Sequence, residues 1–232
     1  MSAIFVTSTG TDIGKTFVTA GLIRHFRRQG GLVSALKPVI SGFDENRPEH
    51  SDPAILLSAL GRSGKLDAIT EISPWRFRAP LSPDMAARRE GKSIDFKALV
   101  DFCSQAVAFR PDLLFIEGIG GVMVPLDSRH TVLDWIVALR VPLLLVAGSY
   151  LGAISHTLTA LDVMLRHRLD VAAVVVSETE GSAVPLNETV AAIARFAAPI
   201  PVAELARIPA GRTEEAAFAR IAALMRLSEG RT

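Results

Sequence analysis

Short apolar runs alternate along this chain with longer segments in which apolar residues recur at helical spacing. Most of the runs are continuous rather than alternating, as strands buried on both faces of a parallel sheet require. They comprise Ile4–Val6, Leu32–Leu36, Leu113–Ile116, Val141–Ala147, Val171–Val176 and Ile200–Ala203. The helical segments lie near residues 16–29, 52–60, 94–109, 131–139, 153–168, 185–197 and 214–227. The pattern predicts an α/β fold with a doubly wound, mostly parallel sheet and helices on both faces.

The chain is expected to form a single domain over residues 1–232. No Gly/Ser-rich linker, internal repeat or shift in composition divides it. The region 61–93 is the least regular part of the pattern, because Pro74, Pro80 and Pro83 interrupt it. We interpret this region as an irregular insertion within the domain.

Composition and charge narrow the classes of partner. Hydrophobic residues make up 49% of the 232 residues and charged residues 21%, as in a folded soluble protein. The 25 Lys and Arg nearly balance 24 Asp and Glu, so the net charge of +1 gives no field that would gather nucleic acid or anionic lipid. No stretch approaches the roughly 20 apolar residues of a membrane span, and no leader is recognisable. We therefore expect a cytoplasmic protein without nucleic-acid or membrane partners.

The cysteine and histidine residues give no indication of a metal cluster. Cys103 is the single cysteine, which excludes an internal disulfide and a cysteine-based metal site. It lies in a segment of helical apolar spacing, so we interpret it as a buried thiol. His25, His50, His130 and His167 do not have the spacing of metal ligands.

The stretch Thr7–Thr16 follows the first apolar run and opens a helical segment. It ends in Gly14-Lys15-Thr16, the triplet that closes a phosphate-binding loop, although Thr9 stands where the standard pattern has its first glycine. Such a loop needs inward-pointing backbone N–H groups at a helix N-terminus, a cation for the terminal phosphates and a hydroxyl for Mg²⁺. Lys15 and Thr16 supply the last two. We predict a variant phosphate loop and a fold like that of P-loop nucleoside triphosphatases.

Three further charged residues lie where predicted strands end or a helix begins. Lys37 leaves the second strand, and beside a phosphate loop this position favours a role in the ligand crevice over a solvated strand end. Glu117 follows a buried strand and precedes three glycines, which is typical of a carboxylate that anchors nucleotide-bound Mg²⁺. Asp52 precedes Pro53 at a helix start, where it is a helix cap, a metal ligand or both.

The segment Leu151–His156 follows another long apolar run and opens a further helix. The N–H groups of its first turn could hold an anion such as a substrate carboxylate. We interpret His156 as a packing or capping residue rather than a catalytic one.

Together these motifs resemble those of the dethiobiotin synthetase family. The resemblance rests on segments that occur in the family's order and spacing: Thr11-Asp12-x-Gly14-Lys15-Thr16, Lys37-Pro38-Val39-x-Ser41-Gly42, Ser51-Asp52, Leu81-Ser82-Pro83, Glu117-Gly118-x-Gly120-Gly121 and Leu151-Gly152-x-Ile154-x-His156. Beyond His156 the chain agrees with the family only in its pattern of strands and helices.

The resemblance implies an ATP- and Mg²⁺-dependent ligase of biotin biosynthesis. Such an enzyme converts 7,8-diaminononanoate, CO₂ and ATP into dethiobiotin, ADP and phosphate, through a carbamate and a carbamic-phosphoric anhydride. Every intermediate is anionic at its reacting end, which suits a site of lysines and backbone N–H groups. The resemblance also implies a homodimer with the active site at the subunit interface.

The resemblance assigns roles to individual residues. The catalytic residues would be Lys37, Lys15 and Thr11, and the metal ligands Thr16, Asp52 and Glu117. The substrate would be bound by Ser41 and, reaching across from the other subunit, by the helix start at Gly152, Ala153 and Ile154. Nucleotide contacts are implied for Asp12, Ile13, Gly14, Lys15, Thr16, Phe17, Asp52, Glu117, Gly118, Ile119, Gly120 and Ser177.

Four departures from the family pattern concern nucleotide binding. Ser8 stands where the family usually has glycine, and Asp12 where it often has glutamate. Ser177 and Glu178 replace an Asn-Asp pair whose amide commonly contacts the base, and Ala206–Ile208 stands near a usual Ile-Pro-Trp. A serine cannot supply the paired donor and acceptor of an amide, so the preference for adenine stays open.

Two other classes share this style of loop and fold. One is the switch ATPase of the chromosome-partition and division-site type, which needs a basic or strongly amphipathic surface element. The tail Glu214–Met225 is apolar at helical spacing but carries few basic residues, which favours a core helix over a membrane anchor. The other class is an amidating synthetase of the cobalamin pathway, whose glutaminase domain has no room in 232 residues.

Overall fold

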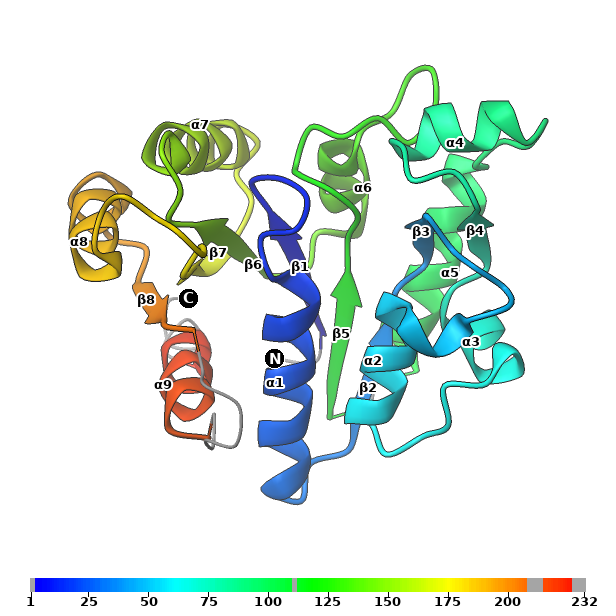
Figure 1. The fold of residues 1–232 in the computed structure, drawn as a ribbon, viewed down its shortest axis with the longest axis horizontal. Helices are drawn as coiled ribbons and strands as arrows, with labels where there is room; N and C mark the ends of the chain where they lie inside the picture. The colour runs from blue at the N-terminus through cyan, green and yellow to red at the C-terminus, as the bar shows by residue number, and fades with distance from the viewer. Residues whose placement is uncertain (1–2, 110–111, 208–214, 227–232) are drawn as a thin grey trace.

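The computed structural model describes residues 3–109, 112–207 and 215–226, and its centre is a sheet of six strands (Figure 1). The strand order is β2-β5-β1-β6-β7-β8, and every strand pair in the described ranges is parallel. The strands are β1 (Ala3–Ser8), β2 (Val33–Leu36), β5 (Leu113–Glu117), β6 (Leu143–Gly148), β7 (Val171–Ser177) and β8 (Val202–Leu205). Each predicted apolar run overlaps one of these strands, because a strand covered on both faces has apolar residues at every position.

Helices cover both faces of the sheet, which confirms the doubly wound prediction. Alternate residues of β1 point to opposite sides: Ile4 and Val6 enter one apolar core, and Ala3 and Phe5 enter the other. The first core lies under α1 (Lys15–Arg28) and α9 (Glu215–Arg226), with α2 (Asp52–Ala59) packed beside α1. The second core lies under α5 (Phe96–Ala108), α6 (Val132–Leu139), α7 (Ala153–Arg166) and α8 (Leu186–Ala197).

A small second sheet lies beside β2, and one of its two strands belongs to region 61–93, which the sequence leaves irregular. It pairs β3 (Val39–Ser41) with β4 (Trp75–Phe77) in parallel. Between and after these strands come the 3₁₀ helix η1 (Pro48–His50), α3 (Leu66–Ile72) and α4 (Pro83–Arg89). Region 61–93 is therefore more regular than the sequence indicated, since it contains two short helices and a strand. Its standing as an insertion in one domain of residues 1–232 stays a prediction.

Two smaller predictions concern single elements. Cys103 on α5 is buried, which confirms the buried thiol. The predicted tail helix 214–227 corresponds to α9, and residues 214 and 227 lie outside the described ranges. Within those ranges, every helix is too short or too polar to cross a membrane.

The loops that follow β1, β2 and β5 gather at one edge of the sheet, because the carboxyl ends of parallel strands lie together. The loop after β5 runs beside the end of β1. The backbone N–H of Gly118 donates to the carbonyl of Val6 at 2.9 Å, and that of Val122 donates to the carbonyl of Ser8 at 3.1 Å. This edge brings the residues of the predicted phosphate loop next to those after Glu117.

Candidate active site

The segment between β1 and α1 forms a tight loop over the start of a helix. Asp12 and Gly14 have positive φ angles of 58° and 93°, and α1 begins directly after Gly14. A side chain at Gly14 would be strained by this φ, and its Cβ would lie only 3.0 Å from Ser177 Oγ. The N-terminus of α1 thus has the exposed N–H groups and the close backbone approach that phosphate binding needs.

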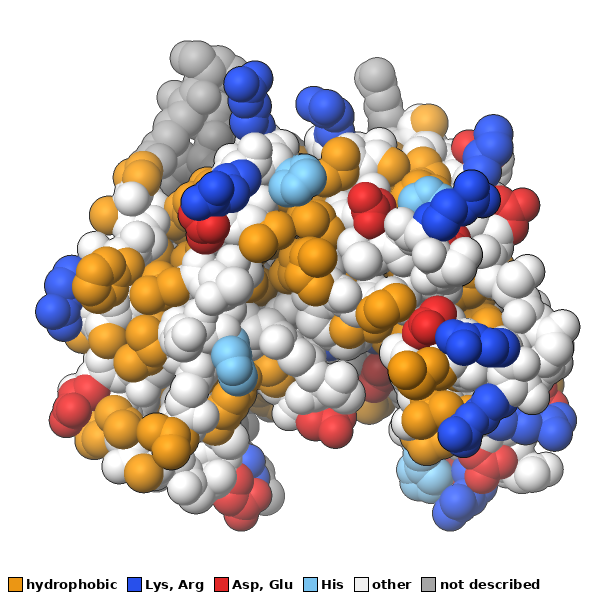
Figure 2. Space-filling model, turned by 90° about the horizontal axis from the view of Figure 1, so that it is seen from above, with side chains coloured by type: hydrophobic (Ala, Val, Ile, Leu, Met, Phe, Trp, Pro, Cys, Tyr) orange, Lys and Arg blue, Asp and Glu red, His pale blue; other side chains and the backbone are white. Residues whose placement is uncertain are grey.

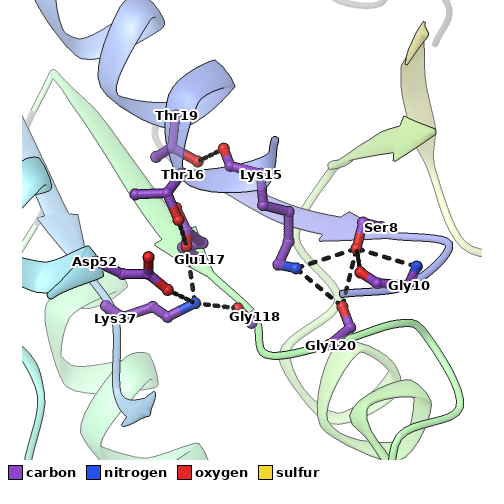
Figure 3. A network of polar contacts seen from close by, with 10 residues as sticks. All are labelled: Ser8, Gly10, Lys15, Thr16, Thr19, Lys37, Asp52, Glu117, Gly118 and Gly120. Carbon is purple, nitrogen blue, oxygen red and sulfur yellow. Dashed lines mark hydrogen bonds and ion pairs between the residues drawn. The ribbon is translucent and has the colours of Figure 1, made fainter. Parts of the chain in front are cut away.

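Lys15 begins α1, and its side chain turns back toward the end of β1. Its Nζ donates to Ser8 Oγ and to the carbonyl of Gly120, both at 3.1 Å (Figure 3). Burial, and to a smaller extent the positive charge of Lys37, lower the pKa of Lys15 to about 8. The loop lysine is therefore inside the site, on acceptors that belong to β1 and to the loop after β5.

Lys37 lies at the centre of a separate charged cluster. Its Nζ donates to Glu117 Oε1 and to the carbonyl of Gly118, both at 2.8 Å, and lies 3.3 Å from Asp52 Oδ2 (Figure 3). The Lys37 side chain is only 2% exposed. Burial opposes its charge, but the carboxylates of Glu117 and Asp52 outweigh burial and raise the pKa of Lys37 above its ordinary value. Lys37 is therefore an ammonium group, held between two carboxylates.

The oxygen atoms around this cluster form a donor set for a hard divalent cation. Thr16 Oγ1 donates to Glu117 Oε1 at 2.7 Å, and Asp52 reaches the same cluster from the start of α2. The second oxygen of Glu117, Oε2, is buried and has no hydrogen-bond partner among the described residues. No group of three His, Cys, Asp or Glu side chains within these residues could hold a metal. Two carboxylates and a hydroxyl nevertheless fit Mg²⁺, which keeps several waters and takes few protein ligands.

A cleft of about 840 Å³ opens between the phosphate loop and the small second sheet. From above, the surface is deeply indented between two lobes (Figure 2). Among the described residues, Ser41 Oγ is buried without a hydrogen-bond partner. The cleft is lined by Thr11, Asp12, Gly14, Lys15, Thr16, Phe17, Lys37, Ile40, Ser41, Gly42, His50, Ser51, Asp52, Pro80, Leu81, Ser82, Pro83, Ile119, Gly120 and Val124. From the sequence we assigned no role to Ile40, His50 or Val124, because none of them is a defining residue of the motifs described above.

A second cavity of about 460 Å³ lies on the other side of the phosphate loop. Arg207 closes part of it: its backbone N–H donates to Glu178 Oε2 at 2.8 Å, and its guanidinium lies 3.2 Å from Glu180. Ile208 lies outside the described residues. The cavity is lined by Asp12, Ile13, Gly14, Phe17, Ser177, Glu178, Thr179, Glu180, Ala206 and Arg207.

The predicted substrate residues at the start of α7 lie elsewhere on the chain. Gly152 has a positive φ of 95° and precedes α7, and Leu151 before it is 90% exposed. Gly152, Ala153 and Ile154 line neither of the two cavities described above. His156 is exposed and its Nδ1 lies 2.8 Å from the hydroxyl of Tyr150. Gly118 does not line the cleft either, but its carbonyl accepts a hydrogen bond from the Nζ of Lys37, which does.

The parallel sheet, the loop at the start of α1 and the lysines beside it define a P-loop nucleotide-binding protein. A family model described as "AAA domain" matches residues 2–215. The cell division ATPase MinD of Pyrococcus furiosus has the same fold, with a TM-score of 0.59 over 98% of this chain and 100% of that one, at 14% identity. At that identity the likeness concerns the fold alone.

Sequence relatives identify the family more closely. The ATP-dependent dethiobiotin synthetase BioD of Acidiphilium cryptum is 47% identical over 205 residues, which cover 87% of this chain and 92% of that protein. The protein of the same name from Caulobacter sp. strain K31 is 51% identical over 197 residues, 84% of each chain. The chain belongs to the family of ATP-dependent dethiobiotin synthetases.

Proposed function

We propose that this protein carboxylates 7,8-diaminononanoate with CO₂ and closes the ring to dethiobiotin, with ATP and Mg²⁺. The observation that carries the proposal is that Lys15, Thr16, Lys37 and Asp52 line one cleft, with the buried Glu117 in contact with both Thr16 and Lys37. Membership of the dethiobiotin synthetase family supports the same reaction.

The reaction needs no nucleophile from the protein. An amine of the substrate attacks CO₂ and loses a proton to become a carbamate. A carbamate oxygen attacks the γ-phosphorus of ATP and displaces ADP. The second amine then attacks the carbamoyl carbon, displaces phosphate and gives up its proton to the released phosphate or to water. Each displaced group carries away the electron pair of the bond that breaks. Lys15 and Lys37 act by holding these anionic groups close together and stabilising the charge that moves between them.

Mg²⁺ would be held by Glu117, Asp52 and the hydroxyl of Thr16. The support is the buried Oε2 of Glu117, which no described residue contacts, and the acid-rich surroundings of Lys37. A bound Mg²⁺ neutralises charge on the β- and γ-phosphates. Ser41, whose buried Oγ is without a partner in the described part of the chain, and Thr11 would hydrogen-bond the reacting end of the substrate.

The nucleotide would lie with its phosphates over residues 11–17 and its base in the second cavity. Ser177 supports this placement, because its Oγ lies against Gly14 and lines that cavity with Ile13 and Phe17. Ile119 and Gly120 line the cleft described first and not this second cavity. The base preference is decided in this cavity, where one hydroxyl replaces an amide.

The start of α7 would complete the site of a second subunit in a homodimer. The exposed position of Leu151 and the absence of Gly152–Ile154 from the lining of this chain's described cavities support a role across an interface. N–H groups at a helix start attract the carboxylate at the far end of the substrate. Both this interface and the residue roles above are part of the proposal.

Phosphate release tests the reaction. The purified protein with ATP and Mg²⁺ should release phosphate only when both 7,8-diaminononanoate and bicarbonate are present, and mass spectrometry should detect dethiobiotin. Lys37→Ala should abolish release, whereas Lys97→Ala, at an exposed lysine on α5, should not. Release that ignores the diamine and bicarbonate but responds to lipid, DNA or another protein would instead identify a switch ATPase.

Mixing two inactive variants tests the shared site. Lys37→Ala removes the ammonium of its own cleft, and Ile154→Asp places a carboxylate where the substrate tail would bind. If the start of α7 acts across a dimer, the re-equilibrated equimolar mixture should recover about a quarter of the wild-type activity, since half of the dimers then contain one intact site. A mixture as inactive as its components contradicts the interface site.

A further inference from the structure

Ser8 makes contacts that the proposed reaction does not use. It is the last residue of β1 and is fully buried. Its hydroxyl has two carbonyl acceptors for its one hydrogen, Gly10 at 2.6 Å and Gly120 at 2.9 Å, and its Oγ accepts from Lys15 Nζ at 3.1 Å. The same ammonium donates to the Gly120 carbonyl. Ser8 Oγ and the Gly120 carbonyl therefore form a closed polar site around Lys15 Nζ.

This polar site is held firmly in place. Gly120 has a positive φ of 57°, and the backbone N–H of Val122 donates to the Ser8 carbonyl. At Gly121 a Cβ would lie 3.1 Å from the carbonyl carbon of Thr9, so the loop after β5 packs directly on the phosphate loop. The two acceptors thus come from segments that cannot easily move apart.

The site lies away from the carboxylates that hold Lys37. Figure 3 shows the Lys15 side chain pointing toward Ser8 and Gly120, while Lys37 meets Glu117, Asp52 and Gly118. A phosphate-loop lysine acts on the β- and γ-phosphates of the bound nucleotide. Lys15 cannot direct its ammonium at those phosphates with full effect while it donates to both of the acceptors behind it.

We propose that Ser8 Oγ and the Gly120 carbonyl form a resting site for the Lys15 ammonium, which nucleotide binding must empty. Ser8 is then a positioning residue that lowers nucleotide affinity by stabilising the free state. The inference rests on the proposed function only in taking the nucleotide to be ATP. The predicted change in nucleotide affinity is the reverse of the usual one, because the loss of a buried hydrogen bond beside the ligand site should here strengthen nucleotide binding rather than weaken it.

Calorimetric titration with a non-hydrolysable ATP analogue and Mg²⁺, without diamine, measures this effect. Ser8→Ala removes one of two acceptors of Lys15 in the free protein only, so the dissociation constant should fall about three- to tenfold. Ser8→Gly should act in the same direction and replaces Ser8→Ala if that variant does not fold. Ser8→Thr keeps the hydroxyl and should bind within about twofold of the wild type.

A double-mutant cycle separates the resting site from a structural role of Ser8. In a Lys15→Met background the ammonium is absent, so Ser8→Ala should leave the dissociation constant unchanged. Weaker binding by Ser8→Ala, or an equal gain with and without Lys15, overturns the resting site. If the wild-type protein binds no ATP analogue, the proposed function fails as well. If it binds and Ser8→Ala brings no gain, only the resting site fails.

Discussion

The buried cluster at Lys37 allows a quantitative prediction for the free protein. Lys37→Met keeps the length of the side chain but removes the charge that faces Glu117, which is completely buried. Glu117 would keep the hydrogen bond from Thr16 and lose its only ion-pair partner among the described residues. Asp52 is 42% exposed, so solvent would replace much of its loss.

The cost is therefore mainly that of one uncompensated buried carboxylate, about 3–5 kcal/mol of unfolding free energy. For a chain of this size each kcal/mol lowers Tm by about 2–4 °C, so thermal unfolding without nucleotide or Mg²⁺ should occur roughly 6–20 °C lower. Differential scanning calorimetry measures this shift directly.

Two controls test the reasoning. Lys97→Met removes an exposed partner of Asp101 on α5 and should change the unfolding free energy by less than about 1 kcal/mol. The double variant Lys37→Met, Glu117→Gln removes both buried charges and should recover most of the lost stability. A single variant Lys37→Met that melts together with the wild type, or a double variant that melts lower still, refutes the account of the cluster.

Three further predictions follow from the same site and from α5. Glu117→Gln should raise the Mg²⁺ concentration needed for half-maximal activity about tenfold or more, and an unchanged metal titration would remove Glu117 from the metal site. Burial raises the pKa of the Cys103 thiol to about 12, so at pH 8 only about one thiol in ten thousand is ionised, a fraction that rises tenfold with each pH unit. Cys103 should react with a disulfide reagent only after unfolding, and rapid labelling of the native protein would show that it is accessible. Ser177→Asn supplies an amide in the second cavity and should raise the preference for ATP over CTP and GTP in a competition titration, whereas equal preference in both proteins would place the base elsewhere.

The large sheet was predictable because its strands are buried on both faces. Runs such as Val171–Val176 leave no polar position, and only a strand or a buried helix tolerates that. The small sheet was not predictable, since β3 and β4 have three residues each and show no period. Proline residues around them resemble a loop in sequence, although Pro83 in fact begins α4.

The site was predictable in its members more than in its contacts. Strand ends and a helix start placed Lys15, Lys37 and Glu117 near one another, because parallel strands share an edge. The sequence marked Ser8 only as a departure from the family, since its contact with Gly120 joins positions 112 residues apart. No local pattern records such a contact. The substrate-binding role of the start of α7, at Gly152, stays a prediction, which the mixing of two inactive variants tests.

The strand order has a consequence for synthesis of the chain. Ala3 of β1 pairs with Leu114, and Phe5 pairs with Leu143, so both neighbours of the first strand are made much later. Until Leu143 has been made, β1 lacks its strand partner on one side, and pairings so distant in sequence form slowly. The phosphate loop, which follows β1, is thus made well before the two strands that fix β1 in the sheet.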